Sequence, residues 1–444
     1  MKIENLLDYQ TILANQARPV HFAIRFDAPT VDQPRPRPAA FCVVLDRSGS
    51  MAGEPLKHAK AATQLAVRNL RPEDQFSLVI FDDETRCLIP LQSASQAKSW
   101  WNKIDQIDTG NSTNLTAGWM LGRDELKKTG PDVMRRLLLL SDGILNVGIV
   151  EPGEVQGIIA SGSEKDSIRT SCLGFGDHYN EDVMSGCARA ASGQFYDAKS
   201  PDLLPAIFAS ELDGLQKIVI QNLRVRVKRL DFCDAYQLLG EYPTVDLPDD
   251  RKEIMVGDLV SSETRILCFE LGVLPLPAVN GQPICSLEGE RLLELEFVFD
   301  EISASGVSSK TVSQVIRIQA TQNPDDVKIR EEIIPWVAMQ KAGRVMEEVN
   351  KRMDSGHAQE AATLLDNTIE QLKQYGPADK VMEAVQRLEH LRALIQSGSF
   401  SLEERKASKY RSSSYRRMSS SEMWSMREKS PSFKKQQPTT PPTP

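Results

Sequence analysis

The sequence predicts an α/β domain with a doubly wound, mainly parallel sheet, inserted into an antiparallel β-sandwich and followed by a helical unit and a disordered tail. Three observations predict this architecture. Short apolar runs alternate with helix-like segments between residues 39 and 216, which is typical of βαβ units. Runs with a two-residue apolar period lie on both sides of that region, as expected for a sandwich. Helical patterns and then a Ser-, Arg- and Pro-rich segment follow.

The predicted strands of the α/β domain are continuous apolar runs, which are expected in a parallel sheet covered by helices on both faces. After Pro55, which suits a first helical turn, Leu56, Ala59 and Thr63 lie at helical spacing. The run 85–91 follows the preceding strand too closely for a parallel crossover, so we expect it to be antiparallel. The other strands are expected at 39–46, 75–81, 135–142, 168–176 and 193–198, and the helices at 55–70, 95–107, 115–129, 151–161, 180–191 and 201–216.

One period-two run precedes the α/β domain and several follow it, so we expect that domain to be an insertion in the sandwich. The runs are 18–29, 218–230, 264–273, 291–300 and 311–320. The chain is thereby divided into an N-terminal segment that adds a strand to the sandwich, the α/β domain, the sandwich, a helical hairpin or three-helix unit, and a tail. The corresponding ranges are 1–38, 39–216, 217–322, 323–397 and 398–444.

The helical unit and the tail differ in composition. Helical periodicity over roughly 325–353, 357–375 and 378–396 is broken by "SG" and "YGP". The tail, 398–444, is predicted to be disordered because it cannot bury enough apolar surface to fold alone. It holds ten Lys/Arg and four Glu, a net charge of +6, which leaves −14 on the rest of a chain whose formal net charge is −8. An acidic body argues against broad nucleic-acid binding.

The compartment is predicted from patterns that the sequence lacks. The first residues do not have the basic, apolar and small-residue regions of a signal peptide. The apolar runs of the whole sequence are far shorter than the roughly 20 residues that a membrane-spanning helix needs. The seven cysteines are scattered and form no CxxC pair, which fits a reducing environment. We therefore expect a cytoplasmic protein without a membrane span; the sequence predicts no oligomeric state.

The stretch "VVLDRSGSMAG" (43–53) ends an apolar strand in one carboxylate and two hydroxyls, Asp46, Ser48 and Ser50. It can be interpreted as a helix cap, a serine nucleophile or a metal cradle. Ligands of open α/β sheets bind at the carboxyl ends of strands, and Mg²⁺ prefers oxygen ligands. "GNSTNLTAG" adds Thr113 and "LLLLSDG" adds Asp142 at the same expected edge. The sequence therefore favours a metal site.

The alternatives are weaker. The cap interpretation assigns Ser50 or Glu54 to a helix start. A nucleophile elbow needs G-x-S-x-G, which neither serine has, while His58 is expected near solvent and His178 in a loop. "GFGDHYN" (174–180) lacks the third glycine of a dinucleotide loop, so we expect Asn180 or Asp177 to cap a helix there. "FDDET" (81–85) is expected to be a solvated turn rather than a second cation site.

On these residues, region 39–216 resembles a von Willebrand factor A (VWA) domain with a metal-ion-dependent adhesion site (MIDAS). The D-x-S-x-S signature matches Asp46, Ser48 and Ser50, and the later threonine and aspartate match Thr113 and Asp142. With its flanking parts, the chain is similar to the bacterial-type proteins labelled calcium-activated chloride channel homologues. Because no membrane span is expected, that label implies no channel activity here.

The resemblance implies a bound Mg²⁺, or Mn²⁺ or Ca²⁺. It implies that the serine and threonine hydroxyls ligate the cation directly, and that the aspartates bind singly or through water. An Asp or Glu of a partner protein would complete the coordination. The expected function is therefore a non-enzymatic, divalent-cation-dependent protein–protein interaction module. The alternatives are an assembly subunit of an ATPase or kinase complex and, less favoured, a metal-dependent hydrolase or phosphatase.

Overall fold

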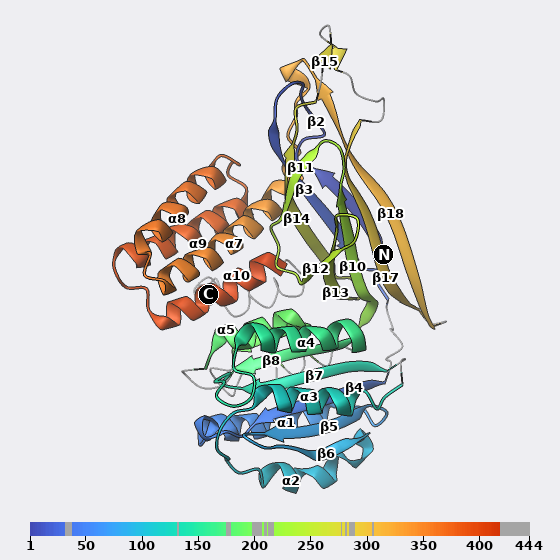
Figure 1. Cartoon of the computed structure of the whole chain (residues 1–444), viewed down its shortest axis with the longest axis vertical. Coiled ribbons are helices and arrows are strands. Elements are labelled where there is room, and N and C mark those ends of the chain that lie inside the picture. Colours follow the sequence, from blue (N-terminus) through green and yellow to red (C-terminus); the bar gives the residue numbers. More distant parts are fainter. Residues whose placement is uncertain are drawn as a thin grey trace, which may run out of the picture.

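The computed structural model has three connected parts: an α/β domain, a β-sandwich and a group of helices (Figure 1). In Figure 1 the α/β domain lies at the bottom, the sandwich above it and the helices beside the sandwich. The chain begins in the sandwich, leaves it to form the α/β domain and then returns. The described residues are 1–31, 38–130, 133–174, 179–197, 207, 211, 217–276, 278–279, 282–283, 289–303 and 306–417.

The α/β domain contains one six-stranded sheet. Its strands are β4 (Ala39–Asp46), β5 (Gln75–Phe81), β6 (Thr85–Ser93), β7 (Met134–Ser141), β8 (Ile168–Gly174) and β9 (Ser192–Asp197). Their order is β6-β5-β4-β7-β8-β9, and all neighbours are parallel except β5 and β6, as predicted. The chain leaves β4 toward β5 on one side, and β7 lies on the other. The carboxyl end of β4 is therefore at a switch point, where such sheets bind ligands.

Helices cover both faces of this sheet because alternate residues of β4 point to opposite sides. Val43 and Leu45 pack with the helices of one face, and Cys42 and Val44 pack with those of the other. The first face carries α1 (Glu54–Asn69) and α2 (Trp101–Asp105); the second carries α3 (Leu115–Leu126), α4 (Pro152–Asp166) and α5 (Glu181–Ala190). The predicted doubly wound α/β fold is confirmed.

One predicted helix of this domain has a different form in the structure, and another lies almost entirely outside the described residues. Instead of one α-helix over 95–107, the chain forms a 3₁₀ helix (Ala94–Trp100) before the short α2. Trp100 is buried there and stacks on Phe76, with ring centroids 5.2 Å apart, so tertiary packing outweighs the helical pattern. The helix predicted at 201–216 falls outside the described residues, apart from residues 207 and 211.

The β-sandwich consists of two sheets. The first has the order β1-β3-β14-β11, and the second β12-β13-β10-β17-β18-β2. The bounds of the first are β1 (Lys2–Leu7), β3 (Arg18–Asp27), β14 (Thr264–Val273) and β11 (Cys233–Leu238). Those of the second are β12 (Thr244–Leu247), β13 (Arg251–Val260), β10 (Ile218–Arg229), β17 (Glu290–Ser303), β18 (Gly306–Thr321) and β2 (Thr11–Leu13). A small hairpin pairs β15 (Ala278–Val279) with β16 (Gln282–Pro283).

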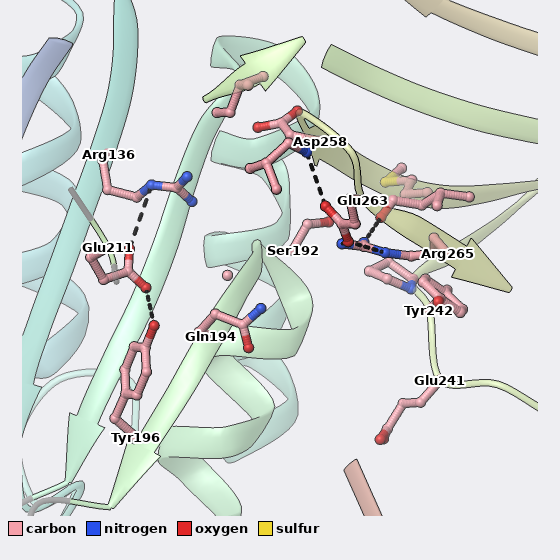
Figure 2. Close-up of a pocket in the computed structure, with 16 residues that line it drawn as sticks. Arg136, Ser192, Gln194, Tyr196, Glu211, Glu241, Tyr242, Asp258, Glu263 and Arg265 are labelled. Carbon is pink, nitrogen blue, oxygen red and sulfur yellow. Dashed lines mark hydrogen bonds and ion pairs between the residues drawn. The ribbon is translucent and has the colours of Figure 1, made fainter. Parts of the chain in front are cut away.

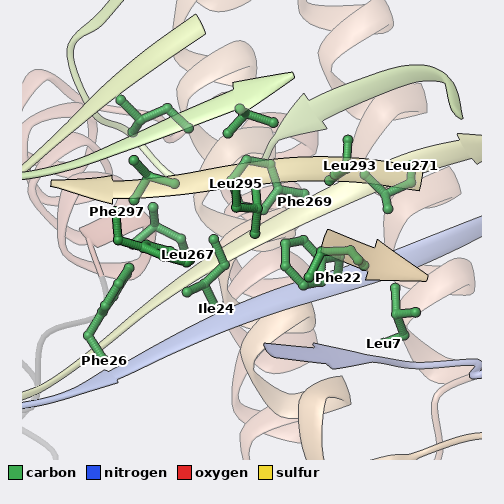
Figure 3. Close-up of a cluster of buried hydrophobic side chains, with 14 of the residues drawn as sticks. Leu7, Phe22, Ile24, Phe26, Leu267, Phe269, Leu271, Leu293, Leu295 and Phe297 are labelled. Atoms are coloured by element: carbon green, nitrogen blue, oxygen red, sulfur yellow. The ribbon is translucent and has the colours of Figure 1, made fainter. Parts of the chain in front are cut away.

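The predicted insertion of the α/β domain into the sandwich is confirmed, because strands from before and after that domain share sheets. In the antiparallel pair of β3 and β14, Phe22 lies opposite Phe269. Their rings are 5.7 Å apart, and Phe26 lies 5.9 Å from Phe297 of the other sheet (Figure 3). Three strands precede the α/β domain, however, rather than the one expected.

The helical unit begins later than predicted. Its helices are α7 (Ile334–Asp354), α8 (Ala358–Lys373) and α9 (Asp379–Gln396). Residues before α7 form two short 3₁₀ turns, Pro324–Asp326 and Glu331–Ile333, instead of helix from 325. Pro335 lies in the first turn of α7 and suits a helix start. No helix among the described residues has the length and apolarity needed to cross a membrane.

The predicted disorder of 398–444 is wrong for part of the tail. Residues Leu402–Arg417 form helix α10, which packs on α7. Tyr415 is buried, and the Ser412 hydroxyl donates a hydrogen bond to the Gly343 carbonyl at 2.7 Å. The tail cannot fold alone, but an existing helix surface supplies the apolar contacts that it lacks. Residues 418–444 lie outside the described part of the chain.

A buried polar cluster joins the sandwich to the helical unit. His21 Nδ1 lies 2.7 Å from Asp8 Oδ2, and its Nε2 lies 3.7 Å from Glu270 Oε2. Lys341 Nζ contacts the same Glu270 oxygen at 2.8 Å, and the Tyr375 hydroxyl lies 3.5 Å from His21 Nε2. Burial lowers the pKa of His21, but the two carboxylates outweigh burial, so the pKa is raised overall.

Candidate metal site

The candidate site starts at the carboxyl end of β4. Asp46 is the last residue of this strand and is fully buried. Its Oδ1 accepts the Ser48 N–H at 2.9 Å, and its Oδ2 accepts the Ser141 hydroxyl at 2.6 Å. Burial raises the pKa of Asp46 to about 6, although these hydrogen bonds lower it. A nearby cation would favour the ionised carboxylate, so the position is suited to a positive ligand.

The two serines of the turn contact each other rather than capping a helix. Ser48 Oγ lies 3.1 Å from Ser50 Oγ; Ser48 is buried and Ser50 is exposed. Ser48 precedes a short 3₁₀ turn without a side-chain capping bond, and α1 is preceded by Gly53, also without one. The helix-cap interpretation of these hydroxyls is therefore wrong.

Thr113 comes from the loop before α3. The Gly49 N–H donates to the Asn111 carbonyl at 2.7 Å, which ties this loop to the serine turn. The Thr113 N–H donates to Asn146 Oδ1 at 2.5 Å. Thr113 is only 1% exposed, yet its Oγ1 has no hydrogen-bond partner among the residues that the structure describes. An unpaired buried hydroxyl is costly, and a bound cation would satisfy this atom.

Asp142 follows β7 directly and is buried. Its Oδ1 accepts the Ile144 N–H at 3.1 Å, and its carbonyl accepts the Asn180 N–H at 2.7 Å. The adjacent Ser141 hydroxyl bonds to Asp46 and accepts the Gly143 N–H at 2.9 Å. The Asp142 charge raises the pKa of Asp46 further.

The loops that carry the five predicted residues are thus joined by direct hydrogen bonds. The donor set contains two carboxylates and three hydroxyls, which suits a hard cation such as Mg²⁺. Among the described residues no group of three or more His, Cys, Asp or Glu side chains could hold a metal. A cation site made mainly of hydroxyl groups is compatible with that finding, and the unpaired Thr113 Oγ1 fits it.

Several residues that shape the site were not predicted from the sequence. Asp82 was expected in a solvated turn, but it is buried and pairs with Arg47 at 2.8 Å. A Cβ at Gly110 would lie 1.6 Å from Asp82 Oδ2, so this pair needs a glycine beside it. Ser141 and Asn146 flank Asp142 in the sequence, but polar loop residues give no signal of which group they will bind.

The described residues do not support the interpretation of Ser48 or Ser50 as a nucleophile. His58 Nε2 is 3.1 Å from Glu54 Oε2 on the exposed start of α1. His178 lies outside the described part of the chain. Asn180 accepts the Val183 N–H at 3.2 Å and caps α5, as predicted for the turn after β8.

A separate hollow of about 170 Å³ lies between the α/β domain and the sandwich (Figure 2). Glu211 accepts a hydrogen bond from the Tyr196 hydroxyl at 2.7 Å and lies 3.7 Å from Arg136. On the opposite wall, Glu263 pairs with Arg265. Of the described residues that line it, none belongs to the candidate set. The hollow is therefore a polar space at the contact between the α/β domain and the sandwich.

Comparisons with known proteins agree with this architecture. An uncharacterized protein of Synechocystis sp. is 26% identical over 349 residues, covering 75% of this chain and 78% of that protein. The uncharacterized protein YfbK of Escherichia coli is 26% identical over 303 residues, covering 63% of this chain but only 51% of YfbK.

The structure of a von Willebrand factor type A protein from Catenulispora acidiphila has the same fold, with a TM-score of 0.67 at 16% identity, covering 87% of this chain and 88% of that one. A sequence profile of the von Willebrand factor type A domain matches residues 42–210. With the sheet order described above, this match identifies the inserted α/β part of the chain as a von Willebrand factor type A domain.

Proposed function

We propose that this chain is a divalent-cation-dependent protein–protein interaction module. Asp46, Ser48, Ser50, Thr113 and Asp142 would hold Mg²⁺, or Mn²⁺ or Ca²⁺, and an Asp or Glu of a partner protein would complete the coordination. The observation that carries the proposal is the Thr113 hydroxyl, which is buried without a partner in the described part of the chain, in a loop bonded to the serine turn. Protein interaction is the general role of von Willebrand factor type A domains.

The charges of the site favour an external carboxylate. Two carboxylates balance the charge of a divalent cation, but both already accept hydrogen bonds from the protein. The three other donors are neutral, so a bound cation would retain a strong attraction for a further anion. Ser50 is exposed, which supports an open side of the proposed site at the protein surface. An ion contact that is partly shielded from water is stronger than an exposed salt bridge, because the effective dielectric constant around it is lower.

We assign binding rather than catalysis to this site because a donor set of two carboxylates and three hydroxyls suits a hard cation. Asp46 is engaged by a backbone N–H and a hydroxyl, so it positions the turn rather than accepting a proton from a substrate. His58, the histidine nearest in sequence, is paired with Glu54. A general base must lie within hydrogen-bond reach of the proton that it removes.

The test is capture of a partner by the full chain immobilised on beads, with Mg²⁺ or with EDTA, next to isothermal titration with Mg²⁺. Ser50→Ala is the main variant because Ser50 is exposed, so we expect its hydroxyl to be removable without loss of the fold. Ser99→Ala is the matched control, since its exposed hydroxyl bonds only locally to the Gln96 carbonyl. We expect an EDTA-sensitive partner for wild type and Ser99→Ala, and its loss for Ser50→Ala. Partner capture that is unchanged by EDTA and also unchanged in Ser50→Ala would contradict the proposal.

A further inference from the structure

Helix α10 is a basic segment that bridges the helical unit and the α/β domain. It carries six Lys/Arg and two Glu, and it lies along α7 near the start of α5. Arg405 pairs with Glu181 and, at 3.0 Å, with Asp182 of α5, and at 2.5 Å with Asp354 of α7. Lys409 also pairs with Asp182. Arg405 therefore contacts two different parts of the molecule, and Lys409 adds a second contact to α5.

The place where α10 contacts the α/β domain is next to the candidate metal site. Lys406 Nζ lies 4.1 Å from the ring centroid of Tyr179, so α10 holds the turn 179–182. In that turn the Asn180 N–H donates to the Asp142 carbonyl at 2.7 Å. Gly143 packs so tightly here that a Cβ would lie 3.0 Å from the Asn180 carbonyl oxygen. Movement of the turn would therefore displace the loop that carries Asp142.

The attachment of α10 depends more on charge than on apolar burial. Among the α10 side chains whose burial the structure describes, Tyr415 is the one large apolar group that is buried. On α7 the helix is seated over Gly343, where a Cβ would lie 2.8 Å from Arg416 Cγ and 2.9 Å from Tyr415 Cβ. Elements with few apolar contacts open at low free-energy cost, and salt weakens ion pairs with a water-exposed partner, such as Asp182, which is 56% exposed in its pair with Lys409.

We propose that α10 is a detachable electrostatic strap that holds the turn 179–182 against the Asp142 loop, so that docking of α10 and cation binding at the candidate site favour each other. The metal half of this statement rests on the proposed function. Because such coupling is reciprocal, release of α10 weakens cation binding, and cation binding strengthens the docking of α10.

The test uses charge reversal at the Lys409–Asp182 pair. Lys409→Glu and Asp182→Lys each break the contact, and the double variant restores an opposite-charge pair. Lys373→Glu is the matched control, because it reverses the charge of a 2.8 Å surface pair with Glu389, which joins α8 to α9 away from α10. Gly343→Ala releases α10 from the α7 side without changing any charge.

Two measurements are made on the full chain. Hydrogen exchange without metal reports on segments 139–148, 179–186 and 402–417, and isothermal titration gives the Kd for Mg²⁺. We expect faster exchange in all three segments and a Kd raised roughly fivefold in both single variants and in Gly343→Ala. The double variant should recover part of both effects, because it restores attraction between positions 409 and 182 but not the Arg405–Asp182 pair. Lys373→Glu should resemble wild type.

The direction of the change in the Mg²⁺ Kd distinguishes release of α10 from a direct effect of the altered charge. Lys409→Glu makes the protein more negative and Asp182→Lys makes it more positive, so a direct charge effect would move the Mg²⁺ Kd in opposite directions. Release of a strap moves it in the same direction. Opposite shifts, or faster exchange in 402–417 without any change in 139–148, would overturn the proposal. If wild type binds no divalent cation, the proposed function fails, whereas the exchange result still decides whether α10 holds the Asp142 loop.

Discussion

Replacing Thr113 by valine should make the metal-free protein more stable. Valine has the shape of threonine without the hydroxyl, and the Thr113 Oγ1 is buried without a hydrogen-bond partner. A buried unsatisfied polar group costs about 1–3 kcal/mol. Removing it while keeping the backbone bond to Asn146 should raise the free energy of unfolding by about 1 kcal/mol in EDTA.

The same substitution should reduce the stabilisation that Mg²⁺ provides. At a Mg²⁺ concentration 100 times the wild-type Kd, binding stabilises the folded state by about 2.7 kcal/mol. If Thr113→Val weakens the Kd tenfold, the increment at that concentration falls to about 1.4 kcal/mol. The variant is therefore expected to gain stability without Mg²⁺ and to lose about half of the Mg²⁺ increment.

The assay is urea unfolding of wild type and variants in EDTA and in Mg²⁺. Thr116→Val is the matched control, because Thr116 Oγ1 is also buried without a partner but Thr116 is not one of the candidate ligands. We expect it to be stabilised in EDTA and to keep the full Mg²⁺ increment. A Thr113→Val protein that is destabilised in EDTA, or one that responds to Mg²⁺ like wild type, would refute the reasoning.

Three further predictions concern the frame of the site and the fold. Asn146→Ala removes the acceptor of the Thr113 N–H, and loss of such a supporting contact should weaken Mg²⁺ binding about tenfold in isothermal titration; an unchanged Kd would contradict this. Gly110→Ala places a Cβ against Asp82 and should lower the free energy of unfolding by about 2 kcal/mol, measured in EDTA so that metal binding does not contribute; wild-type stability would show that the loop adjusts. The pKa of His21 is raised above 6.5, so its contribution to stability is complete below about pH 6.5 and is lost as pH rises through the higher folded-state value. Urea unfolding between pH 6 and 9 should show this loss in wild type and not in His21→Gln, and equal pH profiles would contradict the assignment.

The sequence predicted the α/β domain well because its signals are local and strong. Continuous apolar strands and spaced helices leave few alternatives, and the short link after Phe81 could only make β6 antiparallel. The sandwich was harder. β13 begins with the charged residues of "RKE" and is interrupted at Gly257, whose φ is +95°, so it has no clean period of two. Strands of this kind are defined by their neighbours in the sheet, which lie far away in the sequence.

In the site, too, features set by the local sequence could be predicted, whereas contacts between residues far apart in the sequence could not. The turn after β4 and the ends of the other loops could be assigned to one edge of the sheet from their positions alone. The pairing of Arg47 with Asp82 could not, because the two residues follow different strands and the pair depends on the missing side chain of Gly110. The docking of α10 also depends on the surface of α7, which a composition-based prediction of disorder does not consider.

The most direct test of the central claim is the anomalous scattering of Mn²⁺ in crystals of the chain, with Thr113→Val crystals grown in the same Mn²⁺ concentration. We predict one strong peak for wild type within ligand distance of Ser48 Oγ, Ser50 Oγ and Thr113 Oγ1, and a much weaker peak for the variant. A wild-type crystal without a peak at this edge, or with Mn²⁺ bound elsewhere only, would contradict the account.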